Sequence, residues 1–518
     1  MGRHGSNKRG MVYLVGTGPG DPGLATVKAL DLIRRAEVIV YDHLASPKLL
    51  CEVPASAEMI YVGKEASRHT LPQDRINELL VEHAKAGRLV VRLKGGDPFI
   101  FGRGGEEAEY LAAHTIPFEV VPGITSAIAV PAYAGIPLTH RDFTPAVAFI
   151  TGHERPEKDE STIPWRELAT GPGTLVFLMG VKNLPLICST LMELGRPAKT
   201  PAAVIRWGTL NTQRTITGTL EDIPRRVEEA GLKPPAIIVV GEVVRLRERL
   251  NWFEGRPLFG RRIVVTRSRT QASQLVDLLE GLGAEVFEYP TIHLKTITPN
   301  PGLEQAIRAL DTFDWAIFTS VNGVECFFEQ LDALGLDTRA LGGLAIGAIG
   351  PATAEGLRKR GIRPDFMPED YRAEGIVEGL ISHGIKGKSV LIPRATQARE
   401  ILPRQLEEAG ARVHVIPVYE TLPDPDADTD ELVNLLKKGE ISMVTFTSSS
   451  TVLNFFANLE GKIEKEDLDR VAMACIGPVT KKTLVKKGLS ARVVPERYTI
   501  PDLVEAILAY YGAKNDVQ

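Results

Sequence analysis

Residues 12–26 read VYLVGTGPGDPGLAT, and this stretch decides the fold of the first half of the chain. After an apolar run come three glycines in the G-x-G-x-x-G spacing of dinucleotide-binding folds, at Gly18, Gly20 and Gly23. In those folds the loop opens directly into a helix whose N–H groups hold the pyrophosphate. Here Pro19 and Pro22 remove two of those donors, which argues against a dinucleotide site. The stretch instead predicts a buried strand, a glycine loop, and a helix that begins near Leu24.

The strand-then-helix order continues beyond this loop. Short β-branched runs, each closed by glycine or a turn residue, begin at residues 11, 36, 88, 118, 146, 174, 202 and 236. Amphipathic stretches such as 24–36 and 73–87 lie between them. This alternation predicts an α/β fold with largely parallel sheets.

Composition narrows the class of protein. The chain has 518 residues, 44% hydrophobic and 24% charged, which is ordinary for a globular protein of about three to four domains. A net charge of −4 gives no basic field for nucleic acid. No apolar run reaches the length of about 18 residues that spans a bilayer. The four cysteines are far apart, so we expect no zinc site, no other metal and a reducing, cytoplasmic location.

The second half of the chain contains an internal repeat. Residues 245–262 are charged and then rich in glycine and proline, and a new strand starts at Arg262. From there IVVTRSRTQA matches VLIPRATQAR, GLGAEVFEYP matches EAGARVHVIP, FTSVNGVECFF matches FTSSSTVLNFF, and IGPAT matches IGPVT. All four pairs are 127 or 128 residues apart. We therefore predict a domain at 11–250, a linker at 251–260, and a duplicated domain at 261–518.

The repeats, about 261–387 and 388–518, predict two copies of one α/β unit that face a shared cleft. A duplicated scaffold without chemistry is the alternative interpretation of this pattern.

Five long motifs give the first half a specific resemblance. They are VGTGPGDPGLAT, VGKEASRHTLPQ, RLKGGDPFIFGRGGEE, VVPGITSA and GIPLTHRD, in order along residues 15–142. Together with VYDHL they resemble uroporphyrinogen-III C-methyltransferase, a tetrapyrrole methylase, over residues 11–250. The resemblance implies two α/β subdomains around a cleft, and S-adenosylmethionine as the cofactor.

The resemblance also implies which residues bind this cofactor. They are Pro19, Gly95, Gly96, Asp97, Ile100, Thr125, Ser126, Met179 and Gly208. Glycines let the backbone approach a ligand closely, and a carboxylate can accept from ribose hydroxyls or an amino group. Ser126 replaces the alanine that the family has there. Two alternatives stay open: Met179 can instead fill a gap in the core, and GGDP can be an ordinary turn.

Asp42 and Lys64 match the proton acceptor and donor that are proposed for the family, and general acid–base catalysis suits the deprotonation that follows methyl transfer. The substrate, uroporphyrinogen III, carries eight carboxylates, so arginine and histidine should bind much of it. The candidates are Arg92, Arg103, His140, Arg141 and His153. Each of them can equally be a solvated surface residue.

The second half resembles uroporphyrinogen-III synthase through FTSVNGV, IGPAT, EILPRQLEEAGARVHVIPVYET, FTSSS and IGPVT. That family closes hydroxymethylbilane while inverting the last pyrrole, and needs no metal. Tyr419 matches the tyrosine usually proposed to act near the departing hydroxyl. Hydroxyl and amide groups that we expect on loops after strands can bind carboxylates, namely Thr319, Ser320, Asn322, Thr353, Thr447, Ser448, Ser449 and Thr480. A satisfied strand tyrosine, and helix caps, are the alternatives.

The sequence thus predicts a bifunctional enzyme that makes uroporphyrinogen III and methylates it at C2 and C7 to precorrin-2. The resemblance also implies a homodimer through the first half. Three alternatives remain: a methyltransferase that acts on a later corrin intermediate, a second half that binds a tetrapyrrole without catalysis, and a first half that methylates a protein.

Overall fold

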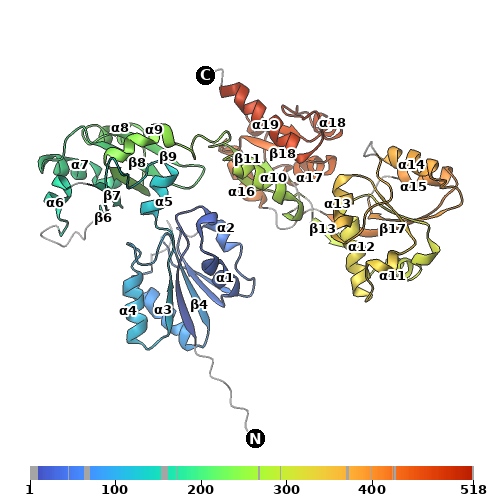
Figure 1. Cartoon of the computed structure of the whole chain (residues 1–518), viewed down its shortest axis with the longest axis horizontal. Coiled ribbons are helices and arrows are strands. Elements are labelled where there is room, and N and C mark those ends of the chain that lie inside the picture. The colour runs from blue at the N-terminus through green and yellow to red at the C-terminus, as the bar shows by residue number, and fades with distance from the viewer. Residues whose placement is uncertain are drawn as a thin grey trace, which may run out of the picture. The chain divides into compact units, whose positions relative to one another are not determined.

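The computed structural model describes residues 10–44, 46–63, 71–152, 162–171, 173–266, 269–291, 293–368, 373–397, 400–422, 424 and 428–515 (Figure 1). The chain divides into two compact units, one of residues 1–261 with 281–285 and the other of residues 262–280 with 286–518. Each unit contains two sheets.

The first sheet of the first unit is wholly parallel, in the order β3-β2-β4-β1-β5. Its strands are β1 (Met11–Gly16), β2 (Val38–Tyr41), β3 (Glu58–Tyr61), β4 (Leu89–Lys94) and β5 (Phe118–Val121). One face packs on α1 (Val27–Arg35) and α2 (Pro47–Leu50), the other on α3 (Gln73–Lys85) and α4 (Gly104–Ala113). The alternation along β4 sends Val91 and Leu93 to α1 and sends Val90, Arg92 and Lys94 to α3 and α4.

The glycine loop leads into helix α1 later than the sequence suggested. A 3-10 turn, η1 (Pro22–Leu24), comes first, and α1 begins at Val27. Thr26 caps α1 by accepting a hydrogen bond from the Ala29 N–H at 3.1 Å, while Asp21 caps η1. The start near Leu24 was therefore placed too early by about one helical turn, because the threonine cap fixes the first helical residue.

The second sheet of the first unit has the order β6-β7-β10-β8-β9. Its strands are β6 (Val147–Thr151), β7 (Thr174–Leu178), β8 (Pro201–Arg206), β9 (Arg214–Thr219) and β10 (Ala236–Val240). Only β6 and β7 pair in parallel, so the expectation of largely parallel sheets is wrong here. The reason lies in β9, a half-exposed strand that the sequence did not reveal, which returns from β8 as a hairpin.

Helices cover both faces of this second sheet. Helix α5 (Ser126–Tyr133) packs on one face together with η3 (Glu242–Leu246). The other face packs on α6 (Trp165–Thr170), α7 (Leu184–Glu193) and α8 (Ile223–Glu229), with η2 (Val181–Asn183) leading into α7. Since α5 follows β5 directly, it carries the chain from the first sheet onto the second.

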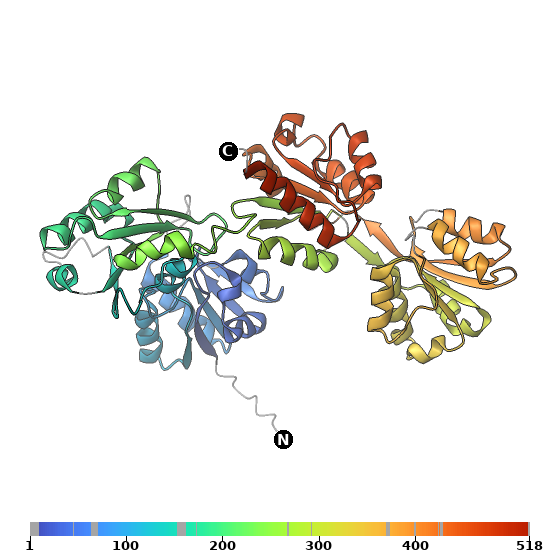
Figure 2. The same cartoon turned by 45° about the horizontal axis from the view of Figure 1, so that its top comes forward.

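The second unit consists of two lobes (Figure 2). Four strands of each lobe follow an equivalent order, and the sheet of lobe 2 has a fifth strand at one edge. Lobe 1 has the sheet β12-β11-β18-β19, formed by β11 (Arg262–Val265), β12 (Glu285–Glu288), β18 (Met443–Phe446) and β19 (Ala472–Cys475). Lobe 2 has the sheet β13-β17-β16-β14-β15, formed by β13 (His293–Thr296), β14 (Trp315–Phe318), β15 (Ala345–Ala348), β16 (Ser389–Ala395) and β17 (Arg412–Leu422). Strand β13 is the antiparallel edge of lobe 2.

The lobes do not coincide with the sequence repeats. Strands β11 and β12 come from the first repeat, but they share lobe 1 with β18 and β19 from the second. Lobe 2 combines β14 and β15 of the first repeat with β16 and β17 of the second. Each lobe is thus one complete copy built from two half-repeats, a pairing that the offset of the repeats cannot reveal.

Helices flank both lobes. Those of lobe 1 are α10 (Arg269–Gly281), α16 (Thr429–Lys437), α17 (Ser449–Leu459), α18 (Pro478–Lys486) and α19 (Ile500–Asn515), with the 3-10 turn η6 (Lys465–Leu468). Those of lobe 2 are α11 (Pro301–Arg308), α12 (Val321–Ala333), α13 (Pro351–Lys359), α14 (Ala373–Ser382) and α15 (Ile401–Glu408), with η4 (Leu310–Thr312) and η5 (Thr338–Leu341).

The segment 251–260, predicted as a linker, is packed and not free. It follows α9 (Arg247–Leu250), and Phe253 and Leu258 are buried in it. The Tyr133 ring lies 4.7 Å from the Phe253 ring, and the Trp252 indole donates to the carbonyl of Ala132 at 3.0 Å. Residues that join the two halves in sequence therefore belong to the core of the first unit.

The four cysteines are free, and three of them are buried. Burial raises the pKa of Cys188 and of Cys475 to about 12, and also raises the pKa of Cys326. Because the thiolate is the reactive form, we expect a thiol reagent at pH 8 to label only Cys51 rapidly in the native chain. Mass spectrometry of labelled peptides before and after denaturation measures this. Rapid native labelling of Cys188 or Cys475 would contradict it, and C51S supplies the blank.

Candidate active sites

Backbone atoms of three glycines touch at the carboxyl ends of β1, β4 and β5. A Cβ added to Gly123 would lie 2.2 Å from the carbonyl oxygen of Gly96, and one added to Gly16 would lie 2.6 Å from the same oxygen. Gly96 and Gly18 also exchange backbone hydrogen bonds of 3.2 and 2.7 Å. We call Gly16, Gly96 and Gly123 the glycine cradle. The space where a Cβ would lie at Gly16 or Gly123 is filled by backbone of the neighbouring loop, so only glycine lets these loops pack in direct contact.

Asp97, one of the predicted cofactor residues, organises the loop next to the cradle. Its Oδ1 accepts from the N–H groups of Phe99 and Ile100 at 2.8 and 3.1 Å, and its Oδ2 accepts from the Gly123 N–H at 3.0 Å. The carboxylate therefore holds the loop against the end of β5. Ile100 is exposed beside it, with Phe99 and Phe101.

Most other predicted cofactor residues lie on loops joined to the cradle. Pro19 stands between Gly18 and Gly20, both at positive φ. Thr125 caps helix α5, and its Cα lies 3.6 Å from the position of a Cβ on Gly96, as does the N–H of Ser126. Gly208 packs so closely on α5 that a Cβ there would lie 2.4 Å from Val130. Helix α5 thus connects the loops of the two sheets.

Backbone strain concentrates on these same loops. Among the described residues six that are not glycine have positive φ, and five of them follow β4, β7 or β8: Phe101, Arg103, Met179, Trp207 and Thr209. Such conformations cost about 1–3 kcal/mol each and gather at functional sites. The Met179 side chain is 55% exposed, so it does not fill a gap in the core. An exposed, strained methionine fits a binding surface.

Asp42 lies at the end of β2 in a chain of charges. Its Oδ2 pairs with Arg92 Nη2 at 3.3 Å, and its Oδ1 accepts from the Leu44 N–H at 3.1 Å. Leu44 in turn packs on Gly95, since a Cβ there would lie 2.6 Å from the leucine Cβ. Asp42 is therefore anchored beside the GGD loop.

Arg92 corrects one prediction. Its side chain is only 5% exposed, and its guanidinium donates to Asp42, to Glu107 at 3.4 Å and to the Leu93 carbonyl at 2.7 Å. The guanidinium is directed under the sheet, where β4 packs on α4, so it is not presented to a substrate carboxylate. Its contact with Asp42 makes it a candidate for orienting that side chain.

Two charged residues that the sequence reading missed complete this buried cluster. Glu107 on α4 is fully buried, and its Oε1 accepts from Lys94 Nζ at 2.8 Å and from Gln73 at 3.1 Å. Its Oε2 has no partner among the described residues. Burial, and next the charge of Arg92, hold the pKa of Lys94 below its ordinary value. The sequence does contain a signal for this cluster: the strand ends in R-L-K, and the next helix starts with G-G-E-E, which places opposite charges on adjacent elements.

The remaining predicted residues of the first unit differ in exposure, and two of them are not described by the structure. Lys64 and His153 lie outside the described residues. Arg103 is exposed and pairs with Glu106 through two contacts of 2.9 and 2.6 Å. His140 is half-buried in a tight turn, where it accepts from the Asp142 N–H at 3.1 Å, and Arg141 is exposed. Arg103 and Arg141 can therefore reach a ligand from solvent.

In lobe 2, Tyr419 and Ser320 come together although 99 residues separate them. Their hydroxyl oxygens lie 3.1 Å apart, and Tyr419 is buried. Ser320 caps α12, because its Oγ accepts from the Gly323 N–H at 3.0 Å. The serine hydrogen can then point to the tyrosine oxygen, which leaves the phenolic hydrogen free for a third group. Thr319 directly precedes the serine, and Asn322 lies in the first turn of α12.

In lobe 1, the equivalent loop is occupied by helix caps. Ser448 and Thr451 form a capping box at the start of α17, and Ser449 accepts from Thr483 of α18 at 3.0 Å. Thr447 precedes this cap, half-buried. The capping interpretation thus holds for Ser448, as it does for Ser320.

Thr353 and Thr480 differ from their prediction as carboxylate ligands. Each lies in the first turn of its helix, α13 or α18, and is only 4% exposed. Neither caps its helix, because Gly350 and Gly477 occupy the cap positions. The first turns direct both side chains into the protein, away from any ligand in solvent.

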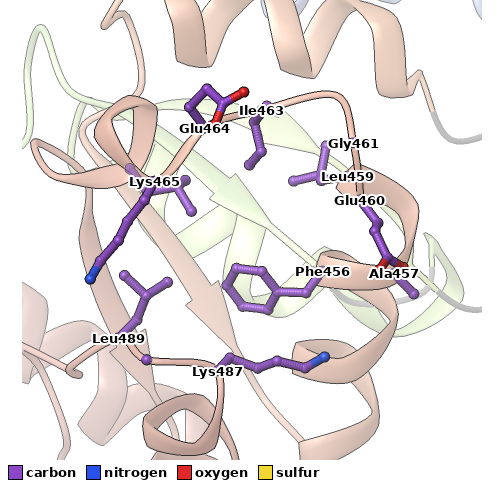
Figure 3. Close-up of a pocket in the computed structure, with 12 residues that line it drawn as sticks. Phe456, Ala457, Leu459, Glu460, Gly461, Ile463, Glu464, Lys465, Lys487 and Leu489 are labelled. Carbon is purple, nitrogen blue, oxygen red and sulfur yellow. The ribbon is translucent and has the colours of Figure 1, made fainter.

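A surface pocket of about 400 Å³ lies elsewhere in lobe 1 (Figure 3). Phe456, Ile463 and Leu489 line it, with Lys465 and Lys487 at its edge. It is formed by the C-terminal end of α17, whereas Ser448 lies at the N-terminal end. The pocket is therefore at the opposite edge of the sheet from the predicted residues, and ligands of parallel α/β sheets bind at the carboxyl edge.

Across the described ranges, no group of three or more histidine, cysteine, aspartate or glutamate side chains is arranged to hold a metal ion. No helix found there is both long and apolar enough to cross a membrane.

Comparison with known families agrees with the two units. The model of the tetrapyrrole (corrin/porphyrin) methylases matches residues 11–224, and that of uroporphyrinogen-III synthase HemD matches residues 273–505. The chain is 40% identical over 509 residues to the porphyrin biosynthesis protein HemD of Ruminiclostridium josui, covering 98% of this chain and 99% of the relative.

Two further similar proteins are methyltransferases. The uroporphyrinogen-III C-methyltransferase of Bacillus subtilis is 45% identical over 363 residues, 69% of this chain and 74% of the relative. The crystal structure of a uroporphyrin-III C-methyltransferase from Thermus thermophilus with S-adenosylhomocysteine is 40% identical; the match covers 46% of this chain and 99% of that chain, with a TM-score of 0.40. The chain therefore belongs to the family of bifunctional porphyrin-biosynthesis enzymes in which an S-adenosylmethionine-dependent tetrapyrrole methylase is followed by a uroporphyrinogen-III synthase.

Proposed function

We propose that the second unit closes hydroxymethylbilane to uroporphyrinogen III with inversion of ring D, and that the first unit methylates this product at C2 and C7 to give precorrin-2. The observation that carries the proposal is the position of Asp42. Its carboxylate is fixed by Arg92 and Leu44 beside the GGD loop, of which Gly96 belongs to the glycine cradle.

The cofactor suits the residues that are present. The glycine cradle, Pro19, Thr125 and Gly208 would hold S-adenosylmethionine, which supplies the methyl group when bound. Cβ atoms at Gly16 or Gly123 would collide with the backbone of the neighbouring loops, so these glycines let the loops of the proposed site pack together. Asp97 keeps the cradle in shape through its bond to Gly123. Met179 would cover the ligand from the second sheet.

Asp42 would accept the proton that leaves the methylated pyrrole carbon. A positioned carboxylate can do this directly because its geometry is fixed on both oxygens. The resemblance assigns the opposite proton transfer to Lys64. For the substrate carboxylates we retain Arg103, His140, Arg141 and His153, since Arg92 is buried in the charge cluster.

In the second unit, Tyr419 would donate a proton to the departing hydroxyl of hydroxymethylbilane. Ser320 fixes the phenol by its hydrogen bond, and helix α12 fixes Ser320. Holding the linear chain in the geometry of ring closure supplies much of the barrier reduction. Thr319, Asn322, Thr447, Ser448 and Ser449 stay candidates for its carboxylates.

The direct test supplies purified protein with hydroxymethylbilane, with and without S-adenosylmethionine, and resolves the oxidised porphyrins. We expect isomer III without the cofactor and dimethylated product with it. If isomer I, the spontaneous product, dominates in both, the second unit is not a synthase. Uroporphyrinogen III supplied directly then tests the first unit alone.

Replacing Tyr419 by phenylalanine should slow isomer III formation by about 10²-fold, because the acid near the departing hydroxyl is lost. Isomer I should rise correspondingly, while methylation of supplied uroporphyrinogen III stays unchanged. Tyr289 of lobe 1 is the control: it is buried and its hydroxyl contacts Thr429 at 2.9 Å, so Y289F should keep the wild-type isomer ratio. Full activity of Y419F would remove the tyrosine from the mechanism.

We also propose a cytoplasmic homodimer that associates through the first unit. Four free cysteines suit a reducing compartment, and the dimer rests on the family resemblance. Light scattering of the full chain after size-exclusion chromatography tests the dimer; a monomeric mass would contradict it.

A further inference from the structure

The segment that joins the two halves contributes a carboxylate to the interior of the first unit. Glu254 Oε1 accepts from Gln213 Nε2 at 2.7 Å and from Thr215 Oγ1 at 2.6 Å. Its Oε2 pairs with Arg247 at 2.5 Å, and the two charged side chains are only 15% and 14% exposed. A charge held this far from water by three donors has a fixed position.

Gln213 connects Glu254 to a strained loop by hydrogen bonds. It is buried, and its Oε1 accepts from the Thr209 N–H at 2.9 Å. Its Nε2 also donates to the Tyr133 carbonyl at 3.3 Å, so both ends of the amide are fixed. Glu254 is thus one of the two acceptors that hold the Nε2 end of this amide, and its bond of 2.7 Å is the shorter of the two.

Thr209 is the residue that needs such support. Its φ is +71°, a left-handed conformation that is an outlier for a β-branched residue. Trp207 at φ +50° makes the other side of the same loop, with Gly208 between them against Val130. Strain of this kind persists only where neighbouring groups hold it in place.

The same loop reaches the glycine loop of the first sheet. Thr209 Oγ1 accepts from the Asp21 N–H at 3.1 Å, and Asp21 Oδ2 accepts from the Tyr133 hydroxyl at 2.7 Å. A continuous set of hydrogen bonds thus runs from Glu254 through Gln213 and Thr209 to Asp21. It joins the two loops that carry Gly208 and Pro19.

We infer that Glu254 is a positioning residue of the methylase, which shapes its cofactor site through Gln213 and Thr209 without touching the ligand. The inference rests on the proposed function, because it takes the loops of Pro19 and Gly208 as the cofactor site. It makes the segment between the halves part of the methylase and not a passive tether.

The test measures binding of S-adenosylhomocysteine to the full chain by calorimetry. E254A leaves Gln213, Thr215 and Arg247 without their shared acceptor, so its Kd should rise by about 10- to 100-fold. E254Q keeps an oxygen for Gln213 and Thr215, and should stay within about threefold of wild type. E248A, in the exposed neighbour Glu248, is the matched control. In turnover E254A should raise KM for S-adenosylmethionine more than it lowers kcat, while cyclisation stays unchanged.

A second variant separates positioning from general loss of structure. Glycine adopts φ +71° without strain, so T209G should reduce the need for support. In a double-mutant cycle, E254A should then cost less in the T209G background than in the wild type. Additive losses would overturn the inference, as would an E254A protein that binds normally.

G208V distinguishes the failure of this inference from that of the proposed site. A valine at position 208 would collide with Val130 of helix α5 and so displace the loop directly. If G208V abolishes binding while E254A does not, only the role of Glu254 fails. If neither changes binding, the loop is not the cofactor site, and both statements fall.

Discussion

Replacing Asp42 by asparagine is expected to lower kcat of methylation by about 10²- to 10⁴-fold, the usual contribution of a general base. Asparagine keeps an oxygen for the Leu44 N–H, so the turn beside Gly95 should survive. What disappears is the negative charge that accepts the proton and pairs with Arg92. Transfer of labelled methyl groups to uroporphyrinogen III measures the effect.

Two controls and one contradicting outcome accompany this prediction about Asp42. Binding of S-adenosylhomocysteine and cyclisation by the second unit should both remain, since neither uses the carboxylate. D31N, on the exposed surface of α1, should methylate at the wild-type rate. If D42N retains more than about a tenth of the wild-type kcat, another group accepts the proton.

Replacing Glu107 by alanine is expected to destabilise the first unit by about 3–5 kcal/mol. The change leaves Lys94 without its carboxylate and Arg92 with Asp42 alone, in a site that water does not reach. Removing one member of a buried ion cluster costs far more than removing an exposed charge. E109A, exposed on the same helix, should change stability by less than about 0.5 kcal/mol.

Urea unfolding of the full chain measures the loss, with tryptophan fluorescence as the main signal. Trp165, Trp207 and Trp252 lie in the first unit and Trp315 in the second, so fluorescence reports mostly on the first. Synthase activity in urea follows the second unit separately and should be unaltered. The double variant E107L/K94M removes both charges and should lose less than E107A. An E107A protein as stable as wild type would show that the cluster is not a stabilising unit.

The positions of the strands could be predicted from the sequence, and for a clear reason. Most residues of a buried strand are apolar, so β1, β2, β4, β5, β7, β8 and β10 stand out as β-branched runs closed by glycine or a turn residue. Strand β9, which reads RTITGT, is half-exposed and carries no such run. Because β9 runs antiparallel to β8, the chain reverses direction there, and the second sheet is mixed and not largely parallel as predicted.

In the candidate site, too, some features could be predicted from the sequence and others could not. Glycines that no side chain can replace were visible as motifs, because a close backbone approach leaves a fixed residue type at a fixed spacing. The environment of a charged side chain leaves no such mark. Arg92 and Arg103 look alike in the sequence, yet one is buried against Asp42 and Glu107 and the other is exposed.

By itself, then, the sequence determined the most apolar strands, the duplication and the glycine loops, since each depends on local spacing. It indicated the two enzymatic activities through whole motifs that resemble known families. Only the tertiary structure decided which half-repeats share a lobe, that Tyr419 meets Ser320, and that Glu254 belongs to the methylase. These are contacts between residues far apart in the chain. These contacts follow from how strands pair and helices pack, and no periodicity along the chain predicts them.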